Sequence, residues 1–132
     1  MVIRKTMNNM EIYNIASALV TLQKKMSDEQ MVFPVKVNFY FQKNTSILVD
    51  MAQDLDEERS NIIMKFGSPS ESNPEQIEIP KDKVEEVNKQ LQDLFSLEQE
   101  VAVNVIDLDW FDGVNMTPAE FAAISFMIKD EE

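Results

Sequence analysis

The chain of 132 residues contains no cysteine, no histidine and only two glycines. Without cysteine, disulfides, zinc–thiolate sites and thiol nucleophiles are excluded. Without histidine, the chain lacks the commonest general base and metal ligand of proteins. The two glycines, Gly67 and Gly113, cannot form a glycine-rich phosphate loop. An enzyme of this composition would depend on carboxylates, lysines, tyrosines or hydroxyls, so we expect a non-enzymatic protein with no cofactor and no metal.

Positive charge is also scarce, because 24 acidic residues stand against 12 basic ones and the formal net charge is −12. Direct nucleic-acid binding needs a basic footprint, and the sequence shows none. Residues 68–132 carry 16 of the acids and only four of the bases, so this half holds the net charge. The surplus forms either a solvated surface or an acidic face that meets a basic partner.

Long hydrophobic runs are absent. No segment approaches the roughly 20 apolar residues that cross a bilayer, and the N-terminal residues lack the apolar core of a signal peptide. We therefore expect no membrane partner and a cytoplasmic location.

The first third of the chain predicts a strand and a helix. Val2–Thr6 suits a strand, and Asn8 with Glu11 has the spacing of a capping box. A helix over Met10–Lys25 follows, because its apolar residues recur every three or four positions. These are Ile12, Ile15, Ala16, Leu19 and Leu22.

The stretch Val35–Phe41 supports two interpretations. Apolar and polar residues alternate through it, which is typical of a strand. A seven-residue apolar repeat runs on from it, however, and favours a helix over about 34–66, with Pro34 at its start and Gly67 just past its end. The members of this repeat are Phe41, Leu48, Leu55 and Ile62. We choose the long helix.

A helix of that length spans ~50 Å, whereas a compact chain of this size is ~36 Å across. The molecule is therefore elongated, or the overhang packs on a second copy as a homo-oligomer. A coiled coil needs a second row of apolar residues beside this repeat. Asn44 and Glu58 interrupt that row, so the helix does not have the regular pattern of a coiled coil. Packing against the chain's own helices is favoured.

The second half predicts a loop, two helices and a strand. Ser68–Glu78 is rich in proline and serine and is expected to be a flexible loop. A helix should open at Pro80 and continue to about Gln99. Val101–Ile106 reads as a strand that pairs with the N-terminal strand, and Thr117 begins a helix with a proline and a capping glutamate. The expected fold is a single α+β domain over 1–132, mostly helical, with three or four helices and a two-stranded sheet.

The segment I-D-L-D-W-F-D-G-V, residues 106–114, resembles a calcium-binding loop. With Asp107 in the first position of an EF-hand, Asp109 falls in the third, as required. The fifth position, however, is Phe111, the sixth is an aspartate instead of glycine, and the twelfth is Pro118 instead of glutamate. The sequence therefore predicts a strand that runs into an acidic turn, with Asp-Gly as turn chemistry.

Carboxylate pairs on the predicted helices, such as Glu85 and Glu86, are neighbours in sequence and do not face each other, so we expect them to be solvated. The candidate site residues are the members of an acidic interaction face. They are Asp107, Asp109, Asp112, Glu85 and Glu86.

Several stretches of the chain resemble a family of small proteins encoded by tailed phages and prophages of Gram-positive bacteria. The resemblance covers most of the chain in order, except the loop 68–78, and it rests on structural rather than catalytic motifs. They are N-N-M-E-I-Y-N-I-A-S-A-L, P-V-K-V-N-F-Y-F-Q-K-N, E-E-R-S-N-I-I-M-K-F-G, L-F-S-L-E-Q-E-V and M-T-P-A-E-F-A-A-I-S-F-M-I. The family is known as a domain of unknown function, so it supplies no catalytic residues. The resemblance implies a phage product in the cytoplasm of the infected host bacterium, and it favours the long helix.

Three functional hypotheses follow. The first is a non-enzymatic protein that binds a phage or host protein during virion assembly or as an accessory factor. The second is an acidic antagonist that occupies the basic channel of a host defence nuclease, which requires the five candidate carboxylates to share one face. The third is a small enzyme or ligand sequesterer that uses carboxylates with Tyr13 or Tyr40, which requires a deep pocket holding a buried acid. We expect the first.

Overall fold

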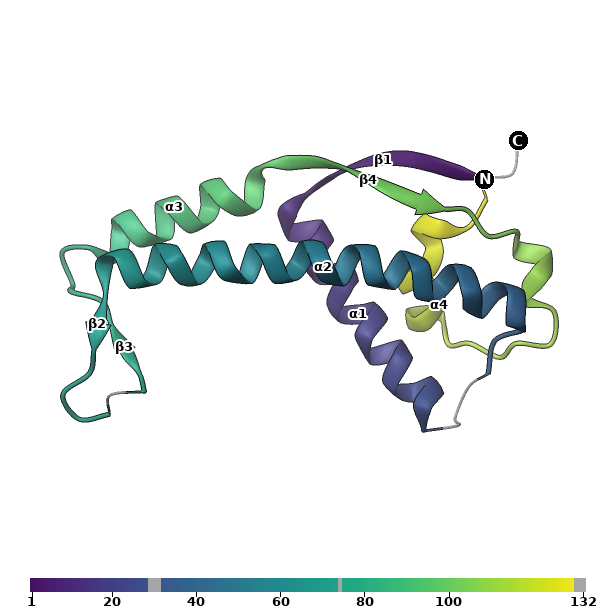
Figure 1. Cartoon of the computed structure of the whole chain (residues 1–132), viewed down its shortest axis with the longest axis horizontal. Coiled ribbons are helices and arrows are strands. Elements are labelled where there is room, and N and C mark those ends of the chain that lie inside the picture. The colour runs from purple at the N-terminus through teal and green to yellow at the C-terminus, as the bar shows by residue number, and fades with distance from the viewer. Residues whose placement is uncertain (29–31, 74, 130–132) are drawn as a thin grey trace.

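The computed structural model describes residues 1–28, 32–73 and 75–129, and it shows an elongated, mostly helical α+β molecule (Figure 1). The predicted fold class is confirmed. The α-helices in these ranges are α1 (Asn9–Ser27), α2 (Val35–Phe66), α3 (Val84–Ser96) and α4 (Pro118–Ile124). The strands are β1 (Val2–Asn8), β2 (Ser68–Pro69), β3 (Ile77–Glu78) and β4 (Glu98–Asn104), and two short 3-10 helices are η1 (Leu108–Phe111) and η2 (Ser125–Met127).

Helix α2 is the long axis of the molecule, at about 48 Å for its 32 residues. The helical interpretation of Val35–Phe41 is confirmed. A strand would have placed its four apolar residues on one face, whereas the helix buries Val37 and Phe41 completely and leaves Val35 88% exposed. Burial is therefore decided by the seven-residue repeat, with Leu48 and Leu55 also in the core.

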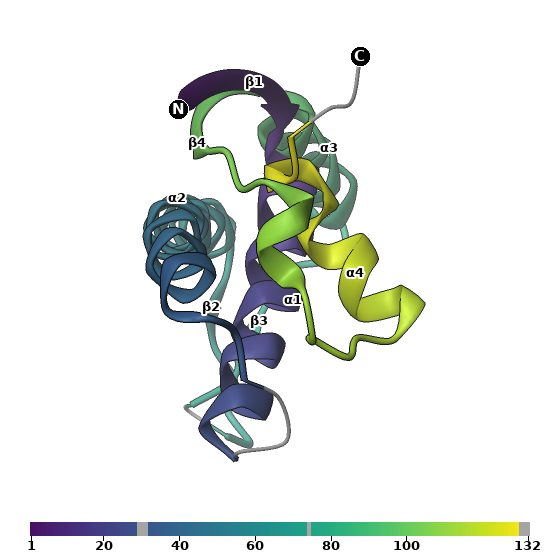
Figure 2. The ribbon, with the colours of Figure 1, turned by 90° about the vertical axis from the view of Figure 1, so that its right-hand side faces the viewer.

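Helix α1 lies between α2 and α4 (Figure 2). Its predicted capping box is present, since the side chain of Asn8 accepts from the backbone N–H of Glu11 and that of Glu11 accepts from the backbone of Asn8. Four of the five predicted apolar positions, Ile12, Ala16, Leu19 and Leu22, are buried, and Ile15 is half-buried. In α1, the predicted cap and most of the predicted buried positions are therefore both present.

The predicted sheet forms by antiparallel pairing of β1 with β4, in a register that places Val2 opposite Asn104 and Asn8 opposite Glu98. Val101 and Val103 turn into the core. Beyond Asn104 the chain leaves β1, and Ile106 forms an isolated parallel bridge with Ile128 instead. Burial follows alternate residues from Val101 to Val105 and then passes to the adjacent Ile106, and the change of partner explains this shift by one residue.

Two predicted boundaries are corrected by the structure. The expected helix from Pro80 to Gln99 is shorter at both ends, because Pro80–Lys83 forms a turn and the chain after Leu97 is already extended into β4. The expected loop 68–78 contains the short antiparallel hairpin β2–β3, in which buried Ser70 bonds to Glu78. Gly67 permits the hairpin to fold back, because a Cβ there would lie 2.4 Å from a methyl carbon of Ile77.

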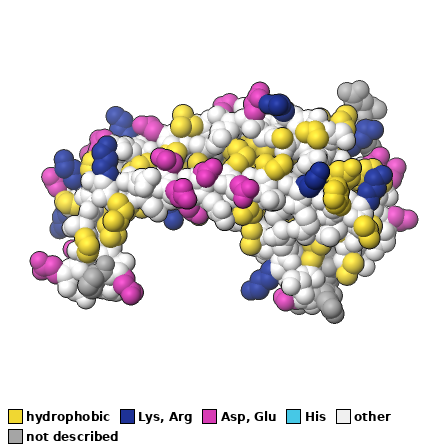
Figure 3. Space-filling view, viewed as in Figure 1, with side chains coloured by type: hydrophobic (Ala, Val, Ile, Leu, Met, Phe, Trp, Pro, Cys, Tyr) yellow, Lys and Arg dark blue, Asp and Glu magenta, His cyan; other side chains and the backbone are white. Residues whose placement is uncertain are grey.

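The overhanging half of α2 packs against α3 of the same chain, where Val87 and Leu55 are buried. The hairpin and α1 project from the same side of α2 and leave a hollowed surface between them (Figure 3). Acidic side chains line the exposed middle of α2, where Asp50, Asp54, Glu57 and Glu58 lie. None of the helices within the described ranges is long and apolar enough to span a bilayer.

Candidate functional site

The aspartate-rich segment that resembles a calcium loop folds into η1 and a turn. Asp107 is the N-cap of η1, since its Oδ1 accepts from the N–H of Asp109 at 3.0 Å, and the Asp107 carbonyl accepts from the N–H of Trp110 at 3.0 Å. The expected turn is present, and Gly113 has a φ of 81°, a left-handed conformation that glycine adopts without strain. Within residues 1–28, 32–73 and 75–129, no three carboxylates gather closely enough to hold a metal ion.

Aromatic packing fixes η1 against the start of α2. The ring of buried Phe111 packs edge-on against Phe33, with centroids 5.6 Å apart. On α2, Tyr40 stacks on Trp110, and the Lys36 ammonium lies 3.9 Å from the centre of the Trp110 ring. Such cation–π contacts hold a lysine over an indole face. The acidic segment is therefore a rigid structural element.

The five predicted acidic residues do not form one face. Glu85 and Glu86 occupy the first turn of α3 at one end of the long axis, whereas η1 lies at the opposite end, beyond β4 (Figure 1). Only Asp107, Asp109 and Asp112 lie in one local segment, and of these the Asp107 side chain is used as a cap. The antagonist hypothesis loses the arrangement on which it depended.

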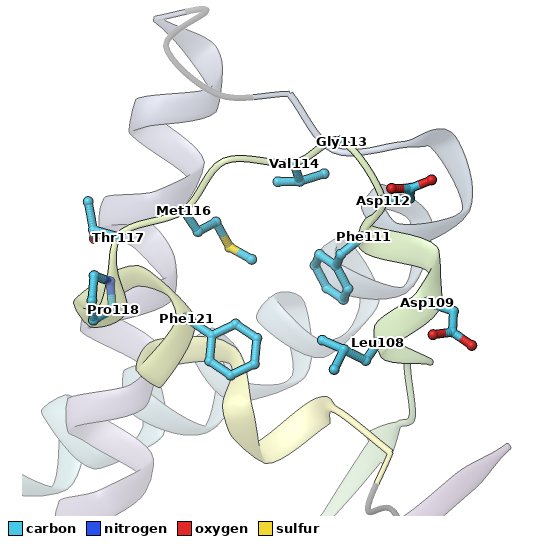
Figure 4. Close-up of a pocket in the computed structure, with 10 residues that line it drawn as sticks. All are labelled: Leu108, Asp109, Phe111, Asp112, Gly113, Val114, Met116, Thr117, Pro118 and Phe121. Carbon is cyan, nitrogen blue, oxygen red and sulfur yellow. The ribbon is translucent and has the colours of Figure 1, made fainter.

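These aspartates lie beside an open hollow of about 770 Å³, which we call the η1–α4 hollow. Figure 4 shows the side chains of Leu108 and Phe111, from η1, turned toward those of Met116 and Phe121. The carboxylates of Asp109 and Asp112 point away from the centre, on the η1 side. The remaining lining residues are Gly113, Val114, Thr117 and Pro118.

Polar contacts hold the α4 wall of the hollow in place on α1. Thr117 caps α4, with its hydroxyl accepting from the N–H of Glu120 and the Glu120 carboxylate accepting from the Thr117 N–H. The predicted helix start is thus confirmed. The other carboxylate oxygen of Glu120 lies 2.6 Å from the Lys25 ammonium at the end of α1. This bond to Lys25, followed by the backbone bond from Thr117, lowers the pKa of Glu120 to about 2.

A second, smaller groove of about 340 Å³ lies between α1 and α2 and includes Tyr13 and Asp56. The Asp56 side chain is 48% exposed and lies 3.7 Å from an Arg59 nitrogen. Tyr13 packs edge-on against Phe95. Tyr40, the other predicted tyrosine, packs on Trp110. Neither tyrosine therefore faces a deeply buried acid, which the third hypothesis requires.

Sequence reasoning missed Phe33, Val114 and Met116, which complete the aromatic anchor and the lining of the hollow. They lie in irregular segments without periodicity, so only their apolar character in a polar stretch could have pointed to them.

Comparison of the chain with protein-family models, with curated proteins and with solved structures finds no match.

Proposed function

We propose that this chain acts by binding another protein, without catalysing a reaction, and that the η1–α4 hollow is its docking site. One observation carries the proposal. Apolar side chains from η1 and α4 converge on an open hollow, while Leu108 is 41% and Phe121 37% exposed. Concave apolar surface of this kind accepts the anchoring side chain of a protein partner.

The polar groups of the hollow favour binding over catalysis. The Asp109 and Asp112 carboxylates point away from its centre, and the Thr117 hydroxyl already accepts a bond from the Glu120 N–H. Catalysis or tight small-molecule recognition uses polar groups that converge on the ligand. The side chains that face into this hollow, which are those of Leu108, Phe111, Met116 and Phe121, instead offer apolar contact area.

The proposal also states where the protein acts and in which process. The sequence motifs described above resemble those of tailed-phage and prophage proteins, and they support a role in the cytoplasm of an infected bacterium, either in virion assembly or as an accessory factor. Recovery of virion proteins as partners would favour assembly, and recovery of a host nuclease would favour the antagonist hypothesis.

Affinity capture from infected cells tests the proposal when the hollow is altered in parallel. The bait variant Leu108→Ser/Phe121→Ser removes the anchor contacts. The matched control is Met10→Ser/Met64→Ser. It removes two exposed apolar side chains elsewhere, from the start of α1 (46% exposed) and from near the end of α2 (56% exposed). We expect a partner that the wild type and the control retain and that the hollow variant loses.

Equal recovery of the same partners by both variants would overturn the docking site, provided that circular dichroism shows both to be folded. Substrate turnover by the purified chain, abolished by one carboxylate-to-amide change, would overturn the non-enzymatic role.

A further inference from the structure

The charged residues that line the η1–α4 hollow have one sign. Two of its ten lining residues, Asp109 and Asp112, are acidic, and none of the ten is basic. Both aspartates are exposed. In Figure 4 their carboxylates lie on the outer side of the η1 wall, whereas Leu108 and Phe111 from the same wall face inward. The hollow therefore combines apolar side chains that face inward with an acidic edge.

This combination selects among partner segments. An apolar side chain that enters the hollow brings its flanking residues to the edge, where the two carboxylates attract lysine or arginine and repel aspartate or glutamate. The net charge of −12 acts in the same direction at longer range. A neutral apolar segment would gain binding free energy only from contact with the side chains inside the hollow.

The hollow is also formed before any partner arrives. The 2.6 Å contact between Lys25 and Glu120 holds α4 on α1, and the N–H of Val114 donates to the Phe111 carbonyl at 2.9 Å. Packing of Phe111 on Phe33 fixes the opposite wall. A partner consequently meets a preorganised site, which lowers the ordering cost of binding.

Building on the proposed function, we infer that the occupant of the hollow is a short basic segment of a partner protein. One bulky apolar side chain of this segment sits between Leu108 and Phe121. Lysine or arginine residues beside it lie against Asp109 and Asp112. The partner class is therefore a protein with an exposed basic, apolar-anchored peptide segment.

Four labelled synthetic peptides of equal length test the inference by fluorescence anisotropy with the full chain. Three carry a central leucine–phenylalanine anchor, flanked by lysine, by serine or by glutamate. The fourth keeps the lysine flanks and replaces the anchor with alanine. We expect the lysine-flanked anchor peptide to bind on the order of tenfold more tightly than the serine-flanked one at low salt, as two exposed ion pairs allow, and the advantage to shrink at high salt.

The protein variant Asp109→Asn/Asp112→Asn should remove this advantage, so that the lysine-flanked and serine-flanked peptides bind it with equal affinity. The matched control is Glu85→Gln/Glu86→Gln, which changes the net charge equally at the far end of the molecule. We expect the control to retain most of the advantage, because the effect depends on charges at the hollow.

The outcomes separate the two proposals. If the serine- and lysine-flanked peptides bind equally and Leu108→Ser/Phe121→Ser abolishes both, the hollow docks apolar anchors but the basic partner is wrong. If the alanine peptide binds as tightly as the anchored one, the docking site itself is wrong. If both charge variants lower the affinity equally, the attraction is global and the local role of Asp109 and Asp112 is wrong.

Discussion

The side chain of Asn44 pairs with the backbone of Asn104 in both directions. Its Oδ1 accepts from the Asn104 N–H at 2.7 Å, and its Nδ2 donates to the Asn104 carbonyl at 2.9 Å. Asn44 is 1% exposed and lies in the first third of α2, and Asn104 is the last residue of β4. The amide thus acts as a peptide group at the end of the strand and fixes the long helix to the sheet.

Replacing Asn44 tests this pairing. Asn44→Ala leaves the Asn104 N–H and carbonyl without their partner, and we expect the free energy of unfolding to fall by about 2–3 kcal/mol. Urea denaturation measures the change. Asn61→Ala, at an exposed position of the same helix, is the control and should cost less than about 0.5 kcal/mol. Equal stability of the two variants would show that the pairing contributes nothing.

Burial along α2 predicts that two valines near its start, Val35 and Val37, contribute unequally to stability. Val37 is fully buried, so Val37→Ala should lose about 2 kcal/mol of unfolding free energy through lost burial and the cavity left behind. Val35 is 88% exposed, and Val35→Ala should stay within about 0.5 kcal/mol of the wild type. Chemical denaturation of both variants checks this. Similar losses would contradict the helix, because only a strand places the two side chains on one face.

The pair Lys25–Glu120 predicts a loss of stability in acid. Its contribution is complete above the ordinary glutamate pKa of 4.5 and disappears as the pH falls toward the lowered pKa of about 2, because protonation removes the charge that Lys25 binds. We therefore expect Lys25→Met to be less stable than the wild type at neutral pH and to converge with it between those values. Lys24→Met, at an exposed neighbour, is the comparison. A Lys25→Met deficit that persists unchanged at the lowest pH would contradict this role of Glu120.

Replacing Gly113 should lower stability through the backbone conformation of the turn and not through a steric clash. A Cβ at this position meets nothing within 4 Å, but its φ of 81° disfavours residues with a side chain. Gly113→Ala should cost about 1 kcal/mol, and Gly113→Asn less, since asparagine tolerates the left-handed region. Thermal unfolding of the two variants measures the difference. If alanine is tolerated as well as asparagine, the left-handed backbone at Gly113 does not constrain the residue at this position.

Part of the fold could be read from local pattern. Asn8 with Glu11, and Thr117 with Glu120, mark helix starts because a cap needs only residues three positions apart. The length of α2 follows from its apolar repeat, which outweighs the alternation at its start. The end of α3 and the hairpin β2–β3 were not predicted correctly. The chain after α3 pairs with β1, and β2 pairs with β3, and short-range spacing does not encode these pairings.

The candidate site was predicted only in part. The sequence drew attention to Asp107, Asp109 and Asp112 and predicted a turn after them, which is present at Gly113. It also grouped them with Glu85 and Glu86, which the fold places at the other end of the molecule. The lining supplied by Met116 and Phe121 could not be foreseen, because the distance between η1 and α4 is set by contacts far apart in sequence.

By itself, the sequence determined that this protein has no thiol or imidazole, where its capped helices begin and most of the buried positions of α1 and α2, since composition, capping and periodicity act over a few residues. Only the tertiary structure decided that the carboxylates separate and that apolar side chains meet in an open hollow. The physical reason is that Ile106 bridges to Ile128 and Lys25 binds Glu120 across long stretches of chain, and these contacts fix the relative position of elements that no local pattern relates.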